Sequence, residues 1–158
     1  MTSRLSPEDA ARHAAEQVVL RAPARARAAA KESSIHSSLL IHRLDIEAAY
    51  YLVSWREPSG RETVVAAIEA DSGELLEVAV HPRPISARRM TPAEARNAVA
   101  RKLPEVTIFG EPRLVWQPCR QTFDMLSPMF ELGTERGQVF VTLDGTVHVK
   151  LDRAGKGG

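Results

Sequence analysis

The sequence predicts an α+β fold in which a helix followed by an antiparallel meander of strands occurs twice. Residues 6–9 and 91–94 each place Ser or Thr before Pro and an acidic residue, which is the pattern of a capped helix start. Residues 71–74 and 143–146 each place a Gly turn before a final strand. The repeated order of these signals indicates an internal duplication.

The first half opens with a helix whose start is well defined. Ser6 is a suitable N-cap, Pro7 fits the first helical position, and Asp9 occupies the place of a capping-box acid. Small and apolar residues then recur at helical spacing until Pro23, which breaks the pattern. The Ala- and Arg-rich segment 24–31 is predicted to be helical again.

Strands follow in the first half, at 38–43, 48–56, 62–70 and 74–81. Their apolar residues alternate, as expected for strands with one face in a core. We expect Tyr51, Val53 and Trp55 to share one face of the second strand, and Val64, Ala66 and Ile68 one face of the third. On the fourth strand we expect Leu76, Val78 and Val80 to point the same way. Residues 81–84, with two prolines, are predicted to be an extended linker.

The second half repeats this plan without a second helix. Thr91, Pro92 and Glu94 form a capping box, and the helix is expected to end before Pro104. Strands are predicted at 113–117, 129–134, 138–143 and 146–151. In the last two strands the inward-facing residues are predicted to be Val139, Val141, Leu143, Val147, Val149 and Leu151.

The spacing of the repeated signals divides the chain into modules. Ser6 and Gly73 are 67 positions apart, whereas Thr91 and Gly145 are 54 apart, so the first copy is longer by the length of segment 22–34. We therefore predict a first module at 1–82 with an inserted helix at 22–34, a second module at 83–153, and a disordered tail at 154–158. A single α+β domain with two similar hairpins is the alternative.

Segments 51–53 and 64–75, and more weakly 130–132 and 139–147, resemble the PepSY-type domain of peptidase propeptides and YpeB-type proteins. The resemblance covers most of the chain apart from segment 22–34. It implies a cystatin-like α+β fold and a non-catalytic module that contacts peptides or proteins. The family has no catalytic set to carry over to this chain. The chain departs from the family in showing no export signal, which argues against a protease-inhibitor role.

Composition and charge narrow the classes of partner. The net charge is +1, so no overall field draws the chain to nucleic acid or to a membrane. Only 5% of residues are aromatic, which argues against a carbohydrate platform or a base-stacking surface. Charge is uneven, because residues 83–102 hold six basic residues and one acidic residue. Arg88 and Arg89 in this segment are candidate contacts for an acidic partner, and nucleic acid is not expected.

No pattern in the sequence predicts an enzyme, a metal site or a cofactor. Cys119 is the only cysteine, so an intrachain disulfide is excluded. No pair of the five histidines has the spacing of helical metal ligands, although His36 and His42 are placed to share a strand face. The N-terminus has no apolar core of a signal peptide and no run is long enough to span a membrane, so we expect a cytoplasmic protein.

The function predicted from these observations is non-catalytic binding of a peptide or protein partner by an accessory module. An exposed sheet edge would supply backbone hydrogen bonds, or a sheet face would supply contacts. Rings and arginines are the candidate binding residues, namely Tyr50, Trp55, Arg88, Arg89, Trp116 and Phe130. Two alternatives remain open: a small cystatin-like enzyme or ligand-binding protein with a pocket on the concave sheet, and a structural protein that forms a homodimer through its edge strands.

Overall fold

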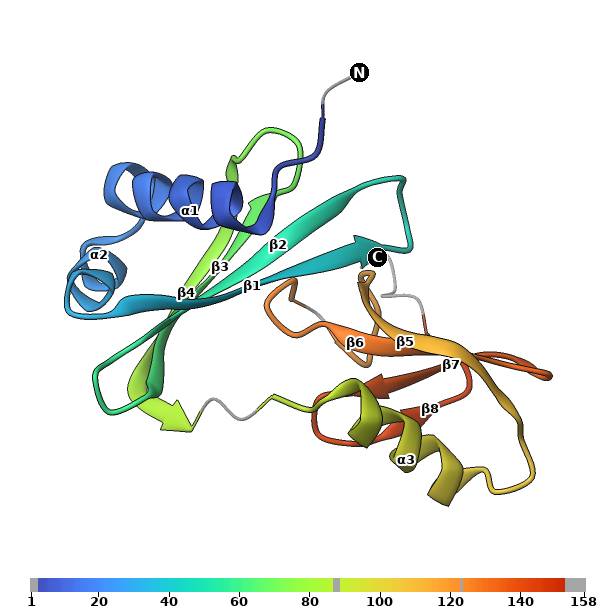
Figure 1. The fold of residues 1–158 in the computed structure, drawn as a ribbon. Coiled ribbons are helices and arrows are strands. Elements are labelled where there is room, and N and C mark those ends of the chain that lie inside the picture. Colours follow the sequence, from blue (N-terminus) through green and yellow to red (C-terminus); the bar gives the residue numbers. More distant parts are fainter. Residues whose placement is uncertain (1–2, 87–88, 123, 153–158) are drawn as a thin grey trace, which may run out of the picture. The chain divides into compact units, whose positions relative to one another are not determined.

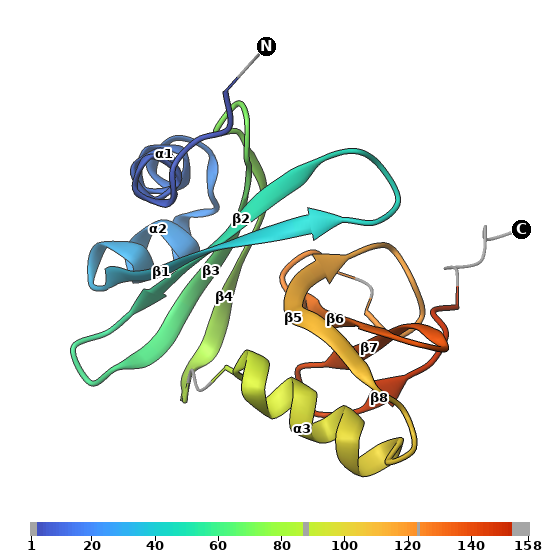
Figure 2. The same ribbon diagram turned by 45° about the vertical axis from the view of Figure 1, so that its right-hand side comes forward.

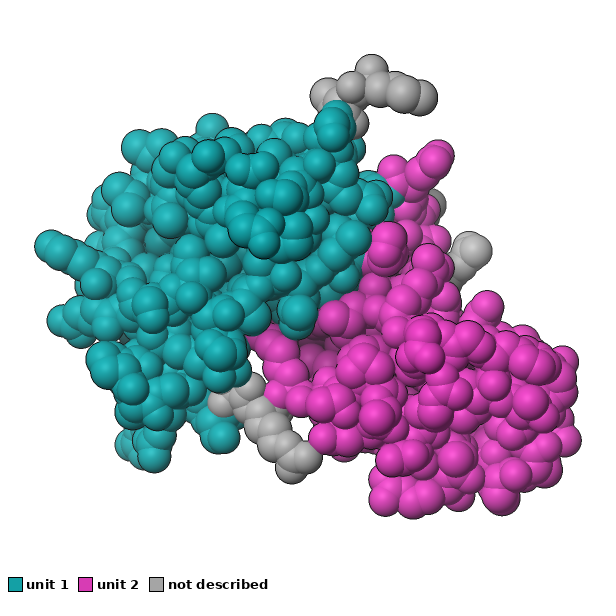
Figure 3. Space-filling view, viewed as in Figure 1, with its two compact units in different colours: residues 1–41, 48–88 teal, residues 42–47, 89–158 magenta. Residues whose placement is uncertain are grey.

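The computed structural model describes residues 3–86, 89–122 and 124–152, and confirms the α+β class with three helices and eight strands among them (Figure 1). The chain divides into two compact units, coloured separately in Figure 3. Unit 1 comprises residues 1–41 and 48–88, and unit 2 comprises residues 42–47 and 89–158. The predicted tail at 154–158 lies outside the described residues.

Unit 1 begins with two helices, α1 (Pro7–Arg21) and α2 (Ala24–Lys31). The Ser6 hydroxyl accepts a hydrogen bond from the backbone N–H of Asp9, as the sequence predicts. Ala22 is extended and Pro23 follows it, so the first helix ends there and the second begins immediately afterwards. The predicted bounds of the second helix are confirmed.

The sheet of unit 1 is a four-stranded meander in the order β4-β3-β2-β1. Its strands are β1 (Ser34–Arg43), β2 (Ala49–Arg56), β3 (Arg61–Glu69) and β4 (Leu75–Ser86). Both helices lie on one face of this sheet (Figures 1 and 2). The core between them includes Ala10, Ala14, Val18, Ala26, Tyr51, Val53, Trp55, Val64, Ala66 and Ile68. The faces predicted for the second and third strands are therefore confirmed.

The fourth strand differs from the prediction. Leu75, not Leu76, packs against the core with Val78 and Val80, and Leu76 is 42% exposed. Ala67 pairs with Glu77 but its neighbour Ile68 pairs with Leu75, so Leu76 is an extra residue in the ladder. Such a bulge shifts the alternation of side chains by one position. The strand also continues through residues 81–84, which we expected to be a linker, although these four residues are out of register with β3.

Unit 2 has one helix, α3 (Pro92–Lys102), and the strands β5 (Ile108–Trp116), β6 (Met129–Thr134), β7 (Gly137–Thr142) and β8 (Val147–His148). Thr91 caps the helix by accepting from the Glu94 backbone N–H, as predicted. The strands pair in the order β5-β6-β7-β8. The helix packs on this sheet through Ala95, Ala98, Val99, Phe130, Leu132, Val139 and Val141. In the segment 42–47, His42 and Arg43 pair in parallel with Val115 and Trp116.

The end of unit 2 also departs from the prediction. Val149 was expected to face inward, but it is 68% exposed. The last strand pairs with β7 only through Val147 and His148, so the alternation has no ladder to maintain it beyond that point. Each unit nonetheless shows a helix followed by a meander. The duplication itself stays a prediction.

Candidate functional site

A hollow of about 460 Å³ opens between the two helices of unit 1, over the second strand. We call it the helix-pair hollow. Ala15, Val18 and Val19 line it from α1, at the spacing of neighbours on one helix face. The lining from α2 shows the same spacing in Arg27, Ala30 and Lys31, and the indole of Trp55 on β2 completes it.

The inner surface of the helix-pair hollow is apolar. Trp55 and Val18 are almost fully buried, at 3% and 1% exposure, so they form its floor. Val19 is 66% exposed although its side chain is aliphatic. An exposed aliphatic residue beside a buried indole leaves apolar area that a ligand can cover.

The rim of the helix-pair hollow is cationic. Arg27 and Lys31 are exposed and lie one helical turn apart on α2. Neither makes an ion pair with any described residue. The arginines of α1 differ, because Arg12 is paired with an Asp at 2.7 Å and Arg21 with a Glu at 3.4 Å. The rim therefore carries two positive charges that this part of the chain does not neutralise.

The structure brings one of the predicted binding rings, Trp55, to a hollow. Tyr50, Trp116 and Phe130 are buried, at 0%, 5% and 4% exposure, and pack inside the fold. Arg89 is half-buried, and Arg88 lies outside the described residues. The binding roles of these five residues stay predictions.

The residues of the rim and wall are not among the binding residues predicted from the sequence. The sequence predicts segment 22–34 as an inserted helix, but its arginines are not among the predicted contacts. A usable signal was present, since Ala15, Val18 and Val19 in one helix and Arg27 and Lys31 in the next repeat at one-turn spacing. Only the packing of the two helices shows that these faces enclose a hollow.

A second, more polar pocket of about 280 Å³ lies where the β3–β4 ladder opens. Val64 pairs with Val80 but Glu62 pairs with Ile85, so residues 81–84 leave the ladder. Two of these four residues are prolines, which cannot donate to a neighbouring strand. We call this the bulge pocket. It is lined by Ala29, Glu32, Ser33, Glu57, Pro58, Thr63, His81 and Pro84.

The bulge pocket contains a carboxylate–histidine pair. The Nε2 atom of His81 lies 2.9 Å from the Oε1 atom of Glu62, whose residue is 5% exposed. A carboxylate in this position orients an imidazole ring and selects its tautomer. The hydroxyls of Ser33 and Thr63 hydrogen-bond to each other at 2.7 Å rather than to the imidazole. The imidazole of His81 is therefore placed like a general base, but neither the Ser33 nor the Thr63 hydroxyl is aligned with it as a nucleophile.

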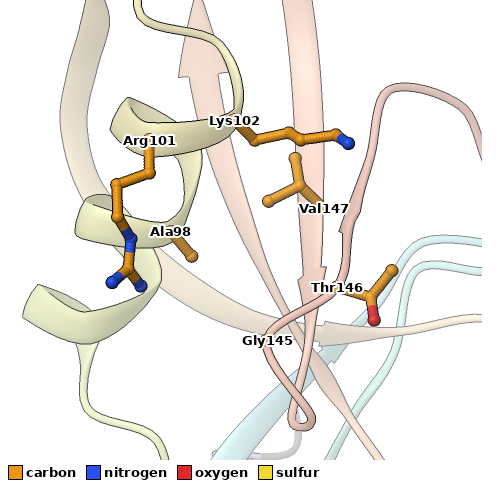
Figure 4. Close-up of a pocket in the computed structure, with 6 residues that line it drawn as sticks. All are labelled: Ala98, Arg101, Lys102, Gly145, Thr146 and Val147. Carbon is orange, nitrogen blue, oxygen red and sulfur yellow. The ribbon is translucent and has the colours of Figure 1, made fainter.

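Unit 2 has a hollow of about 390 Å³ between the last turns of α3 and the turn that leads into β8 (Figure 4). Arg101 and Lys102 line it beside Ala98, Val147 and the turn residues. Figure 4 shows the two charged groups directed away from each other, one along the helix and one across the strand. Arg96, in the same basic segment, is engaged with Glu111 at 3.6 Å and the Gly110 carbonyl at 2.6 Å. Arg101 and Lys102 therefore do not converge on one ligand in this hollow.

The cysteine and histidine candidates form no metal centre in the described part of the chain. Cys119 is fully buried, and its Sγ atom donates to the carbonyl oxygen of Thr122 at 3.8 Å. No helix in the described ranges is long and apolar enough to cross a membrane.

No family model matches the chain, and no curated protein matches it. Solved structures that resemble it include a protein from Clostridium difficile 630 described as a lipoprotein. That likeness has 16% identity and a TM-score of 0.29, over 77% of this chain and 83% of the other. The YpeB C-terminal domain from Bacillus megaterium has 12% identity and a TM-score of 0.30, over 99% and 68%. TM-scores this low carry no argument, so the PepSY resemblance stays a prediction.

Proposed function

We propose that this chain is a non-catalytic accessory module that binds a peptide segment in the helix-pair hollow. The observation that carries the proposal is the lining of that hollow, where an apolar floor and two unneutralised cations meet. The partner is a segment that presents one large apolar side chain next to a carboxylate. Its apolar group covers Trp55, Val18 and Val19, and its charge is complementary to Arg27 and Lys31.

The energies expected for such a contact are modest but sufficient for specific binding. Burial of a large aliphatic side chain is worth about 1.5–3 kcal/mol. Charge-assisted hydrogen bonds to exposed cations add less than buried pairs do, because water and salt screen them. Together with the ordering cost of the segment, these terms predict micromolar rather than nanomolar binding.

The β4 edge of the sheet of unit 1 supports peptide binding less well than the hollow does. The outer strand β4 has a bulge at Leu76 and prolines at positions 82 and 84. Only residues 77–80 between them have a regular backbone on which another strand can pair. Bulges and prolines are the devices that prevent strand addition at sheet edges.

A pair of neighbouring residues on α1 tests the proposal. Val19 lines the hollow, whereas Leu20, which is 73% exposed, does not. The wild-type chain is expected to retain peptides from a synthetic mixture, and Val19→Ser to weaken the best of them roughly 5- to 30-fold, for a loss of about 1–2 kcal/mol. Leu20→Ser removes an equally exposed aliphatic group and should leave the affinity unchanged. Equal effects of the two changes, or no retained peptide, would contradict the proposal.

The bulge pocket favours a second candidate function, binding or conversion of a small polar ligand. His81 oriented by the buried Glu62 is the specific observation in its favour. A panel of esters and amides incubated with the chain tests it. Turnover that is lost in His81→Gln and kept in Val19→Ser would establish this function. Turnover that survives His81→Gln would show that the bulge pocket is not the site of the reaction.

A further inference from the structure

In the helix-pair hollow, the cationic rim and the apolar wall are close enough for one residue of a bound peptide to contact both. Arg27 and Lys31 are separated by one turn of α2, which places their Cβ atoms about 5–6 Å apart. Ala30 lies on the same face and lines the hollow between the helices. An anion held by both side chains therefore lies directly beside the apolar wall.

The size of the hollow limits what can enter it. A volume of about 460 Å³ lies in the lower half of the range of small-ligand pockets, roughly 300–1,000 Å³. It has room for one large side chain and the atoms attached to it. A long segment would have to lie outside it, over the exposed surface of α1 and α2.

An acidic residue in the middle of a peptide is poorly suited to contact the cations and the apolar wall together. Its carboxylate ends its own side chain, so a second residue must supply the apolar group, and both residues must be ordered on binding. A C-terminal residue carries an apolar side chain and a carboxylate on the same Cα atom. Fewer of its rotatable bonds therefore have to be fixed when the peptide makes these two contacts.

We infer that the hollow binds the C-terminal residue of a peptide, with its apolar side chain against Trp55 and its α-carboxylate between Arg27 and Lys31. The inference rests on the proposed function and identifies the part of the peptide that is bound. The α-carboxylate accepts hydrogen bonds from the guanidinium and the ammonium group, which are charge-assisted. The partial negative charge at the end of α2 weakens the attraction near Lys31, so Arg27 is the stronger contact.

Fluorescence anisotropy with a matched pair of peptides tests the inference. Both peptides carry an N-terminal fluorophore and end in leucine, one as the free acid and one as the amide. The free acid is expected to bind at least about tenfold more tightly than the amide, and the advantage should shrink at high salt. A third peptide, with the leucine followed by glycines, is expected to bind as weakly as the amide.

Variants in α2 test whether the α-carboxylate of the peptide lies between Arg27 and Lys31. Arg27→Gln and Lys31→Gln should each reduce the advantage of the free acid, and the double variant should abolish it while the amide binds as before. Arg25→Gln is the matched control, because Arg25 is exposed on the same helix but does not line the hollow. Circular dichroism of each variant establishes that the helices are retained.

The outcomes separate the inference from the proposed function. If the acid and the amide bind equally well and Val19→Ser weakens both, the hollow binds peptides but not their C-termini, and the inference is wrong. If neither peptide binds, both statements fail. If octanoate displaces the free acid at concentrations comparable to those of the leucine peptide, the site recognises any amphiphilic carboxylate and the peptide assignment is overturned.

Discussion

The imidazole ring of His13 on α1 packs directly against Gly73 in the turn between β3 and β4. A Cβ atom at position 73 would lie 2.6 Å from the Cγ and Nδ1 atoms of that ring, closer than packed atoms approach. Gly73 also has a φ of +76°, a backbone conformation that L side chains rarely adopt. The contact joins the helix to the hairpin that it covers, and so helps to position the wall of the helix-pair hollow.

Substitution of Gly73 is expected to destabilise unit 1 more than the same change at a comparable turn. Gly60 has a φ of +88° and open space around it, so Gly60→Ala should cost only the conformational penalty, about 1–2 kcal/mol. Gly73→Ala should cost this amount and, in addition, the displacement of the His13 ring. Urea denaturation of the two variants measures the difference. Equal losses would show that the ring moves away freely.

The pair formed by Arg43 and Asp45 predicts a pH dependence of stability in unit 2. The guanidinium contacts the carboxylate at 2.6 and 3.0 Å, and this hydrogen bonding holds the pKa of Asp45 below its usual value of 3.8. A carboxyl whose folded pKa is lowered stabilises the fold above the unfolded pKa, and the stabilisation is lost as pH falls through the folded pKa. Arg43 also lies 5.3 Å from the centroid of the Trp116 ring, so the pair anchors the segment 42–47.

Asp45→Asn is therefore expected to lower the urea midpoint above pH 3.8 and to have a smaller effect at more acidic pH. Denaturation curves of the wild type and the variant across this range supply the measurement. A difference between the two proteins that stays constant down to the most acidic pH would contradict the role assigned to the pair.

Self-association through the β4 edge of unit 1 is expected to be weak in the wild-type chain. The prolines at positions 82 and 84 and the bulge at Leu76 interrupt the outer strand. A variant with Pro82→Thr and Pro84→Thr restores backbone donors and should associate more strongly. Light scattering at two concentrations measures the change, with Pro58→Thr, in a turn, as the control. If the double variant associates no more than the wild type, the prolines do not protect this edge.

The elements that could be predicted from the sequence are those governed by local rules. Ser6 and Thr91 mark helix starts through hydrogen bonds to residues three positions away, and Pro23 marks a helix end through its missing donor. Alternation along β2 and β3 places the right side chains in the core because those strands are regular there. Local chemistry was sufficient in each of these cases.

The features that escaped prediction depend on partners distant in the sequence. The bulge at Leu76 is visible only in the pairing with β3, and Val149 is exposed because the last ladder is short. The helix-pair hollow depends on how two Ala-rich helices diverge over Trp55, which no periodicity encodes. The chemistry of aromatic rings makes them candidate contacts, but Tyr50, Trp116 and Phe130 are buried in the fold.

The most direct test of the central claim, that peptides bind in the helix-pair hollow, is a map of backbone amide chemical shifts during titration with the leucine-terminated peptide. The account predicts that the largest changes occur in the stretches of α1 and α2 that line the hollow, around Val19 and Arg27, and at the indole N–H of Trp55. Changes concentrated instead along residues 77–80 of β4 would show that this edge of the sheet is the binding surface and would contradict the claim.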